Sequence, residues 1–436
     1  MTETLTLDEA RQIWPILSVS ERIEAFQSME RSAADAFFRE LSADERGAIV
    51  LAQTTVERLP WLRLLQPDDA ADVVQSVPAR ERESVLGLLD EQTRHEVIAL
   101  LAYAEDEAGG LMNPRFARLR PDMTVGESLR YLERQAQEKL ETIYYAYVLD
   151  HEQRLLGVVS FRELFVAARE KALKDVMHTE VVSVADTMDQ EAVARVMAQR
   201  DLNALPVVDD QGRMKGIVTV DDIVDVFQQA ATEDIHKLGG MAALDTGYLQ
   251  TGLLAMIKKR AGWLSALFLG EMLTATAMGR YEDEIAKAVV LALFVPLIIS
   301  SGGNSGSQAT TLVIRAMALG EVTVQDWWRI IHREAVAGLS LGLILGSIGL
   351  VRILTWQAMF HTYGEHYKQV AATVALSLVG VVTWGTLAGS MLPFVIRRLG
   401  FDPASASAPF VATLVDVSGL VIYFNVAQLI LQGSLL

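Results

Sequence analysis

Residues 409–424 read PFVATLVDVSGLVIYF, an apolar run with a single carboxylate, Asp416, near its middle. The apolar character continues to residue 431, and about 20 such residues suffice to cross a bilayer as a helix. A charged side chain inside hydrocarbon is costly unless it faces a polar cavity, a partner or a cation. The stretch therefore predicts a membrane-spanning helix that carries a functional carboxylate.

Four more apolar segments of comparable length precede this one, at residues 262–279, 288–314, 335–354 and 370–396. Five spans place the two ends of the chain on opposite sides of the membrane. Eight Lys and Arg residues flank the spans on one side and four on the other, and the richer side is normally cytoplasmic. We expect a multi-pass protein of the inner or plasma membrane with a cytoplasmic N-terminus and an external C-terminus.

The acidic charge lies entirely in the first part of the chain. The 436 residues carry a net charge of −17, of which residues 256–436 contribute +2 and residues 1–255 contribute −19. Such an acidic half repels nucleic acid and anionic lipid and favours cations or basic proteins. The sequence has no cysteine, which excludes disulfides and thiolate metal sites. The acidic N-terminus has none of the features of a cleaved signal peptide, so we expect this half to remain cytoplasmic.

The first hundred residues repeat every 12 positions. Units begin at Leu17, Met29 and Leu41, more weakly at Gln53, and again at residues 65, 77 and 89. Each unit has the length of one short helix, with Ser, Pro or Asp near its start as a cap. Repeats of helix pairs with a 24-residue period are typical of stacked helical solenoids. Most single carboxylates here are expected only to solvate the surface.

Residues 113–227 contain two segments with the same β-α-β-β-α pattern. Each segment is expected to begin its helix with a capping box, Thr124 with Glu127 and Thr187 with Gln190. Each also ends in the pattern Gly-x-x-Ser/Thr-x-x-Asp/Glu. This duplication resembles a tandem pair of CBS domains, in which the hydroxyl and the acid often hold a nucleotide ribose. The matching residues are Gly157, Ser160 and Glu163 in the first copy, and Gly216, Thr219 and Asp222 in the second.

Two carboxylates lie well inside predicted spans, Asp416 and Glu271, and no basic residue lies at a comparable depth. Each is a candidate for a cavity, for a cation or for protonation. Glu271 has the alternative of a protonated carboxyl group that bonds to a neighbouring helix. Asp402, which follows Arg397 and Arg398, is expected near the cytoplasmic end of its span, where a simple helix cap before Pro403 is the alternative.

The second span carries PLIISSGGNSGSQATTLVIRA, residues 296–316. Glycine and small hydroxyl residues let helices approach closely, or let a helix break so that its carbonyl groups can bind a cation. Both alternatives are open at this point. The candidate pore-lining residues are Gly302, Gly303, Asn304 and Gln308.

The order of helical superhelix, CBS pair, connecting helix and five spans resembles the MgtE family of magnesium channels. The resemblance covers essentially the whole chain. It is carried by EDEAGGLM, DQEAVARVM, GIVTVDDIVDV, ATEDIHKLGG, GGNSGSQATTLVIRA, the MLPF and RRLGFDP stretches and PFVATLVDVSGLVIYF. A multidomain fold follows: an all-α superhelix at 1–112, α/β tandem CBS domains at 113–172 and 173–228, a connector at 229–259 and an all-α membrane domain at 260–436.

The resemblance also implies site residues. Asp416 corresponds to a pore aspartate that selects hydrated Mg²⁺ in a homodimer, and Asp402 to a second acidic position at the cytoplasmic side. Mg²⁺ prefers oxygen ligands and loses its water reluctantly, which agrees with such a filter. The positions implied to bind cytosolic Mg²⁺ and to close the pore are Asp68, Asp72, Asp189, Glu191, Asp201, Asp222, Asp225, Glu233 and Asp234. Taken by itself, Asp189 is equally well a charge at a helix N-terminus.

We therefore expect a Mg²⁺-selective channel, with Mg²⁺ both transported and regulatory and with ATP as a candidate ligand at Thr219 and Asp222. The partners expected are a second copy of the chain, Mg²⁺ and membrane lipid, without nucleic acid. Two other readings stay open: a cation-coupled carrier in which Asp416 or Glu271 binds H⁺ or Na⁺, and a nucleotide-sensing CBS module on a membrane anchor. No P-loop, catalytic triad or HExxH motif favours an enzyme.

Overall fold

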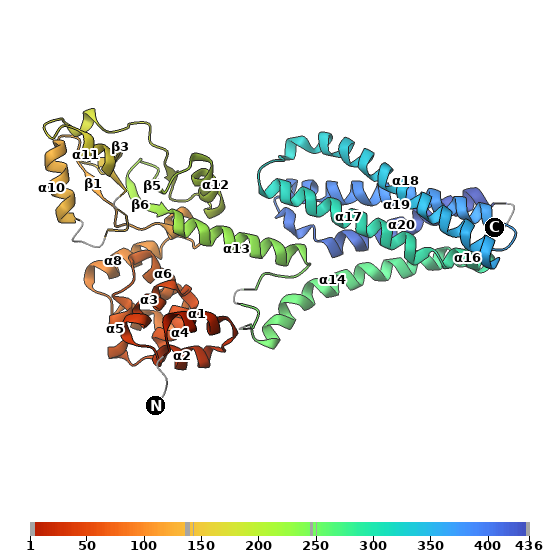
Figure 1. Cartoon of the computed structure of the whole chain (residues 1–436), viewed down its shortest axis with the longest axis horizontal. Coiled ribbons are helices and arrows are strands. Elements are labelled where there is room, and N and C mark those ends of the chain that lie inside the picture. The colour runs from red at the N-terminus through yellow and green to blue at the C-terminus, as the bar shows by residue number, and fades with distance from the viewer. Residues whose placement is uncertain (1–4, 136–139, 143, 245–246, 250, 433–436) are drawn as a thin grey trace. The chain divides into compact units, whose positions relative to one another are not determined.

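A computed structural model describes residues 5–135, 140–142, 144–244, 247–249 and 251–432. The chain divides into two compact units, Met1–Ala230 and Ala231–Leu436. The first contains short helices and two small sheets, and the second contains long helices (Figure 1). The expected multidomain fold, with a helical N-terminal part, a pair of α/β segments and a part built of long helices, is confirmed.

The 12-residue repeat of the N-terminal part is confirmed, because seven successive helices begin 12 residues apart. The first residues of most units, such as Leu41, Leu65 and Val77, are buried between the helices. A shorter α1 and a single 3₁₀ turn at Trp14–Ile16 precede the repeat. The helices are α1 (Leu7–Ile13), α2 (Val19–Gln27), α3 (Arg31–Glu40), α4 (Ala43–Ala52), α5 (Thr55–Leu62), α6 (Pro67–Ser76), α7 (Ala79–Leu86) and α8 (Glu91–Leu100).

A ladder of ion pairs joins alternate helices of the repeat. The arginine at the fourth helical position pairs with the acid at the third position of the helix two units later, as in Arg22–Glu45, at 2.6 Å, and Arg46–Asp69. Arg22 Nε also donates to the carbonyl oxygen of Trp14, at 2.9 Å. Both arginines are less than a tenth exposed. A buried arginine is tolerated only when its charge and its donors are satisfied, so the ladder fixes the helix spacing.

The two CBS segments form two three-stranded sheets with the same topology. In each, the first strand is parallel to the second and the second is antiparallel to the third. The first copy contains β1 (Arg118–Leu119), α10 (Val125–Gln135), β2 (Tyr145–Leu149), β3 (Leu155–Ser160) and α11 (Phe161–Val166). The second contains β4 (Val184–Ala185), α12 (Gln190–Arg200), β5 (Ala204–Val208), β6 (Met214–Thr219) and α13 (Val220–Leu238). A short α9 (Ala108–Leu111) precedes them.

The capping box expected at Thr124 and Glu127 is confirmed, with Glu127 accepting from the backbone and hydroxyl of Thr124. The one expected at Thr187 and Gln190 is wrong. Asp189 is the N-cap of α12 instead, and its Oδ1 accepts from the amides of Glu191 and Ala192, at 3.1 Å each. A carboxylate next to the first free N–H groups satisfies two of them at once.

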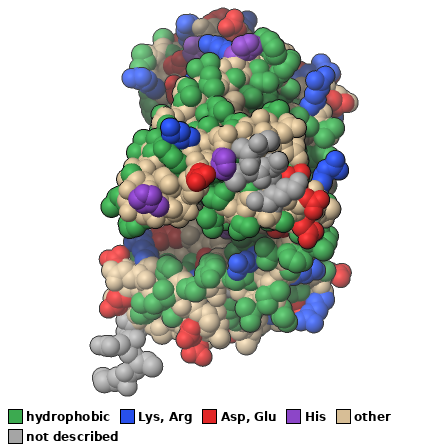
Figure 2. Space-filling view, turned by 90° about the vertical axis from the view of Figure 1, so that its right-hand side faces the viewer, with side chains coloured by type: hydrophobic (Ala, Val, Ile, Leu, Met, Phe, Trp, Pro, Cys, Tyr) green, Lys and Arg blue, Asp and Glu red, His purple; other side chains and the backbone are tan. Residues whose placement is uncertain are grey.

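Five helices in the described residues are long and apolar enough to cross a membrane, as expected. Each extends beyond its predicted span, and the first includes Lys258, Lys259 and Arg260. Many of their large apolar side chains, for example Leu264 and Phe268, are exposed, and Figure 2 shows broad hydrophobic areas on the face it displays. The elements are α14 (Leu253–Arg280), α15 (Glu282–Lys287), α16 (Val289–Ala292), α17 (Val295–Ala318), α18 (Trp327–Phe360), α19 (Tyr367–Arg398) and α20 (Ala408–Leu431).

Helices α17, α19 and α20 pack against one another, α18 packs on α19, and α14 packs on α20 (Figure 1). Helices α17 and α19 approach each other closely. A Cβ atom placed on Gly385 or Gly389 would collide with the backbone oxygen of Gly302 or Gly306. Glycine at these positions lets two membrane helices touch backbone to backbone, where dispersion and polar contacts hold them together. Thr310 adds a hydrogen bond of 2.7 Å to the carbonyl oxygen of Gly389.

Candidate ion sites

Asp416 lies half-buried on α20 and faces the glycine-rich part of α17. A methyl group placed on Gly303 would lie 3.6 Å from Asp416 Oδ1 and 3.4 Å from Ala412 Cβ. The absence of a side chain at Gly303 thus leaves room beside the carboxylate. The two segments that the sequence singled out are therefore neighbours in the fold.

Helix α17 is unbroken through its glycine-rich part, so close packing is the alternative that the structure realises there. Gly302 and Gly303 are buried, and Gly302 contacts the side chains of Val381 and Val415. Asn304 and Gln308, by contrast, are exposed. They belong to a polar stripe on one face of α17, spaced three or four residues apart, that consists of Ser300, Asn304, Gln308 and Thr311.

Glu271 on α14 is close enough to Asp416 on α20 to act on it electrostatically. The two helices meet where Gly270 faces Thr413, whose Cγ2 would lie 2.9 Å from a Cβ atom on that glycine. Thr413 is one helical turn before Asp416. The two carboxylates inside the membrane helices thus belong to the same part of the unit.

Asp402 has two roles in the structure, and one of them is the helix cap. Its Oδ1 accepts from the amide of Ala404, at 2.9 Å, at the start of the 3₁₀ turn Pro403–Ser405. Its Oδ2 lies 2.5 Å from Lys237 Nζ in the last turn of α13. Lys237 Nζ also lies 2.5 Å from Glu233 Oε1. One ammonium group therefore joins two acids that the sequence analysis named separately.

A second group of acids lies in the first unit, where α6 faces the start of α13. We call it the acidic cluster. Four of its members were expected from the sequence: Asp68 and Asp72 on α6, and Asp222 and Asp225 on α13. The four others are Asp69, Glu105, Glu141 and Asp221, each of which acts electrostatically on one or more of the expected acids.

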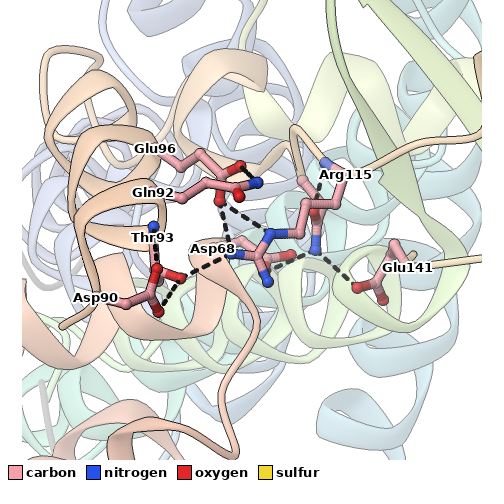
Figure 3. A network of polar contacts seen from close by, with 8 residues as sticks. Asp68, Asp90, Gln92, Thr93, Glu96, Arg115 and Glu141 are labelled. Carbon is pink, nitrogen blue, oxygen red and sulfur yellow. Dashed lines mark hydrogen bonds and ion pairs between the residues drawn. The ribbon is translucent and has the colours of Figure 1, made fainter. Parts of the chain in front are cut away.

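Asn113 holds two carboxylates of the acidic cluster. Its Nδ2 donates to Asp68 Oδ1 at 3.0 Å and to Glu141 Oε2 at 2.7 Å, and the residue is fully buried. Arg115 accompanies it, with its backbone N–H donating to Asn113 Oδ1 and its guanidinium to Glu96 and Thr93 (Figure 3). Nothing in the sequence pattern marked Asn113 or Glu141, since each lies in an irregular segment.

Burial raises the pKa of five carboxyl groups of the acidic cluster, and repulsion from neighbouring acids raises it further; they are Asp68, Asp72, Glu141, Asp222 and Asp225. The pKa of Asp72 rises to about 7, through burial and then the charges of Asp69 and Asp222. The pKa of Asp222 also rises to about 7, mainly through burial, and that of Asp68 rises well above its usual value. Carboxylate oxygens are ligands that Mg²⁺ prefers. A bound divalent cation would offset the repulsion among these acids.

The remaining acids that were expected to bind metal lie outside the acidic cluster. Asp189 is the N-cap of α12, Glu191 pairs with Arg195 at 3.4 Å, and Asp201 is the left-handed C-cap of the same helix. Asp234 lies on α13 in the second unit. Within the part of the chain that the structure describes, no three His, Asp or Glu side chains converge tightly enough to hold a bare ion. An ion at the acidic cluster would thus keep part of its water.

The expected nucleotide residues are satisfied within each CBS copy. Asp222 Oδ2 accepts from the Thr219 hydroxyl at 2.8 Å, and Glu163 Oε2 accepts from the Ser160 hydroxyl at 2.8 Å. Glu163 also bonds His178 Nε2 at 2.5 Å, which helps to lower its pKa. Asp222 is therefore shared between the Thr219 pair and the acidic cluster.

Comparison with known proteins assigns these parts. A family model described as a divalent cation transporter, MgtE, matches residues 295–426. The model of the MgtE intracellular N domain matches residues 5–106, and the CBS domain model matches 108–170 and 173–229. A magnesium transporter MgtE of Thermus thermophilus is 40% identical over 424 residues, covering 97% of this chain and 92% of that protein. The chain belongs to the MgtE family.

A second relative agrees with this assignment. A magnesium transporter MgtE of Enterococcus faecalis is 31% identical and covers 98% of this chain and 94% of its own length. The cytosolic domain of a Mg²⁺ channel MgtE, solved in complex with ATP, is 41% identical with a TM-score of 0.47. It covers 51% of this chain and 91% of its own length. The MgtE membership and the five apolar helices identify a multi-pass membrane protein of a magnesium transporter family.

Proposed function

We propose that the protein is a homodimeric Mg²⁺ channel that admits Mg²⁺ to the cytoplasm and closes when cytosolic Mg²⁺ binds its acidic first unit. The observation that carries the conducting role is Asp416 beside Gly303, next to a polar stripe on α17. A hydrated Mg²⁺ needs a wide path lined with oxygen atoms, and a carboxylate with amide and hydroxyl neighbours provides one. Asn304 and Gln308 are the proposed pore-lining side chains, and Gly302 and Gly303 shape the wall behind Asp416.

A second copy of the chain would cover the polar stripe of α17. Exposed amide and hydroxyl groups on a membrane helix are costly against lipid but favourable against a water-filled path. The first unit offers a matching contact, because Val220, Val224 and Phe227 form an exposed apolar row on α13 with i, i+4, i+7 spacing. Both features support a homodimer with its pore on the two-fold axis.

The acidic cluster is the proposed Mg²⁺ sensor. Asp68, Asp72 and Asp222 are held close together while their charges repel, so the arrangement is favoured by any divalent cation that neutralises them. Oxygen-only ligands that keep some water suit Mg²⁺. Cation binding there would close the pore, and its loss would release α6 from α13. Asp189, Glu191, Asp201, Glu233 and Asp234 stay proposed secondary positions of the sensor.

The orientation and the sensor require the first unit to be cytoplasmic, as the Lys and Arg distribution predicts. Tandem CBS domains bind nucleotides in relatives, and ATP is a candidate ligand at Thr219 and Asp222 here. The negative charge of the acidic cluster repels a polyphosphate. We therefore propose that Asp222 either binds ATP together with Thr219 or stays with the other acids of the cluster, so that the two states compete. Titration with a fluorescent ATP analogue at rising Mg²⁺ tests this, and analogue binding that Thr219→Ala leaves unchanged would refute the site.

Mg²⁺ uptake into liposomes tests the channel. Purified protein is reconstituted with a Mg²⁺ dye inside, and the wild type is compared with Asp416→Asn and with the exposed control Asp283→Asn. We expect flux in the wild type and in the control, loss in Asp416→Asn, and closure when millimolar Mg²⁺ faces the first unit. Undiminished flux in Asp416→Asn would rule out the pore assignment.

A cation-coupled carrier is the second candidate, because Glu271 places another carboxylate near Asp416. Two neighbouring acids in a membrane can share a proton, which is what proton coupling requires. The same liposomes discriminate between the two functions. A channel follows the Mg²⁺ gradient and voltage alone, whereas a carrier responds to an imposed proton gradient and loses that response in Glu271→Gln.

A further inference from the structure

The end of α13 and the residues that follow it form a compact junction with the membrane helices of the second unit. We call residues 233–244 the connector end. The turn after α13 is closed by three backbone bonds, from Gly240 to Lys237, Met241 to His236 and Ala242 to Lys259. Lys259 Nζ also donates to the carbonyl oxygen of Ala243, at 2.5 Å. The connector end is thus a built structure rather than a loose link.

Two apolar contacts seat the connector end at the start of α20. Gly240 has a positive φ of 71°, and a Cβ atom there would lie 2.8 Å from the Trp263 ring and 3.3 Å from Pro409. Glycine adopts this conformation without strain, and its missing side chain leaves this space. Leu238 packs with Ile314, Ala404 and Ala406. Pro409 precedes Asp416 by seven residues, or about 10 Å along the helix.

Lys237 separates two negative charges at this junction. Glu233 on α13 and Asp402 in the turn before α20 both contact Lys237 Nζ, and without it their repulsion would push the connector end away. Lys237 Nζ lies 2.5 Å from an oxygen of each. Its side chain is only 28% exposed, so it is screened less than a surface ion pair. Lys237 thus occupies the place of a bridging cation.

We propose that Lys237 is a positioning residue that holds the connector end on the membrane helices and orients Asp402 at the entrance to the pore. It supplies permanently the bridging charge that a divalent cation would otherwise have to supply there. The connector end then docks with less cytosolic Mg²⁺ than the two acids alone would need. This inference rests on the proposed channel, and it names a determinant of the Mg²⁺ concentration at which that channel closes.

The test uses the full-length protein with two readouts. The first is the Mg²⁺ concentration, on the side of the first unit, that halves the liposome flux. The second is hydrogen exchange of residues 236–244 at a fixed low Mg²⁺ concentration, which reports docking without any flux. Lys237→Gln should raise the half-closing concentration about fivefold, the effect of one partly exposed ion pair, and should speed exchange in this segment. Lys237→Arg keeps the charge and should restore both values to near those of the wild type.

Lys258→Gln is the matched control, because Lys258 is exposed in the same unit and its loss changes the net charge equally. It should leave both readouts unchanged. The double variant Lys237→Gln/Asp402→Asn should exchange hydrogen only slightly faster than Lys237→Gln, because both substitutions break the same Lys237–Asp402 contact. Wild-type values in Lys237→Gln, an equal shift in Lys258→Gln, or failure of Lys237→Arg to restore them would overturn the proposal. If Asp416→Asn still conducts, the channel fails while the exchange result on Lys237 stands.

Discussion

Replacing Asp222 by Asn should stabilise the first unit when no divalent cation is present. The folded protein holds the Asp222 pKa at about 7, against an ordinary value of 3.8. A carboxyl group with a raised pKa binds more protons in the folded than in the unfolded state between about pH 4 and pH 7, so stability falls as the pH rises through that window. Asn keeps the shape and an acceptor for Thr219, but it carries no charge.

The magnitude follows from the shift. About three pKa units correspond to a ceiling of about 4 kcal/mol at pH 7.5. Protonation of Asp68 or Asp72 relieves part of the same repulsion, so we expect about half, roughly 2 kcal/mol. For a unit of this size that raises Tm by about 6 °C.

Differential scanning calorimetry measures the effect on the full-length protein in detergent. The melts are compared in EDTA and in about 10 mM Mg²⁺, roughly a saturating level for a regulatory site of this kind. In EDTA, Asp222→Asn should melt higher than the wild type. In Mg²⁺ its advantage should vanish or reverse, because the wild type gains the cation and the variant loses a ligand. Asp210→Asn, at an exposed position outside the acidic cluster, should change neither melt. A lower Tm in EDTA, or an equal gain with and without Mg²⁺, would refute the reasoning.

Three further outcomes are expected. Mg²⁺ should bind the first unit more tightly as the pH rises from 6 to 8, because Asp72 and Asp222 lose protons near pH 7; a Mg²⁺ titration with the same midpoint at both pH values would contradict this. Arg22→Ala should cost about 3 kcal/mol of unfolding free energy in urea, since it leaves Glu45 without its buried partner, whereas Arg11→Ala, which removes two exposed ion pairs, should change it less. Gly389→Leu should prevent α17 and α19 from meeting, so that the protein elutes as an aggregate in detergent, while a monodisperse, conducting variant would argue against the packing.

Periodicity predicted the fold well. The 12-residue spacing located seven helices, including the weak unit at Gln53, because most units have a buried first residue and several have a capping side chain before the helix. The length of the apolar segments located the five spans, because a membrane-crossing helix needs about 20 apolar residues in succession. The error at Thr187 is instructive, because two N-cap candidates lay two residues apart and the sequence does not show which amide groups need a partner.

The acids of the candidate sensor were named through the resemblance to the MgtE family rather than through a pattern in the sequence. Asp68, Asp72 and Asp222 were named in this way, and the structure places them together. Glu141 and Asn113 were missed because they join the acidic cluster by tertiary contact from irregular segments. Lys237 was missed because a lysine near a helix C-terminus is ordinary there, and its bond to Asp402, 165 residues away, leaves no local trace.

The ion-pair ladder of the N-terminal repeat gives the acidic cluster an origin. Three steps, from α2, α4 and α5, combine an arginine at the fourth position of one helix with an acid at the third position two helices on. The steps from α3 and α6 have Ala34 and Ala70 in place of the arginine, and the step from α6 also lacks the acid, with Thr93 at that position. Asp69 on α6 pairs with Arg46 of α4. Helix α6 itself contains no arginine that could pair with α8, and its other acids, Asp68 and Asp72, face α13. The proposed sensor therefore lies in a unit of the repeat that keeps the acids of its neighbours and lacks the arginine that would pair with an acid of the next unit but one.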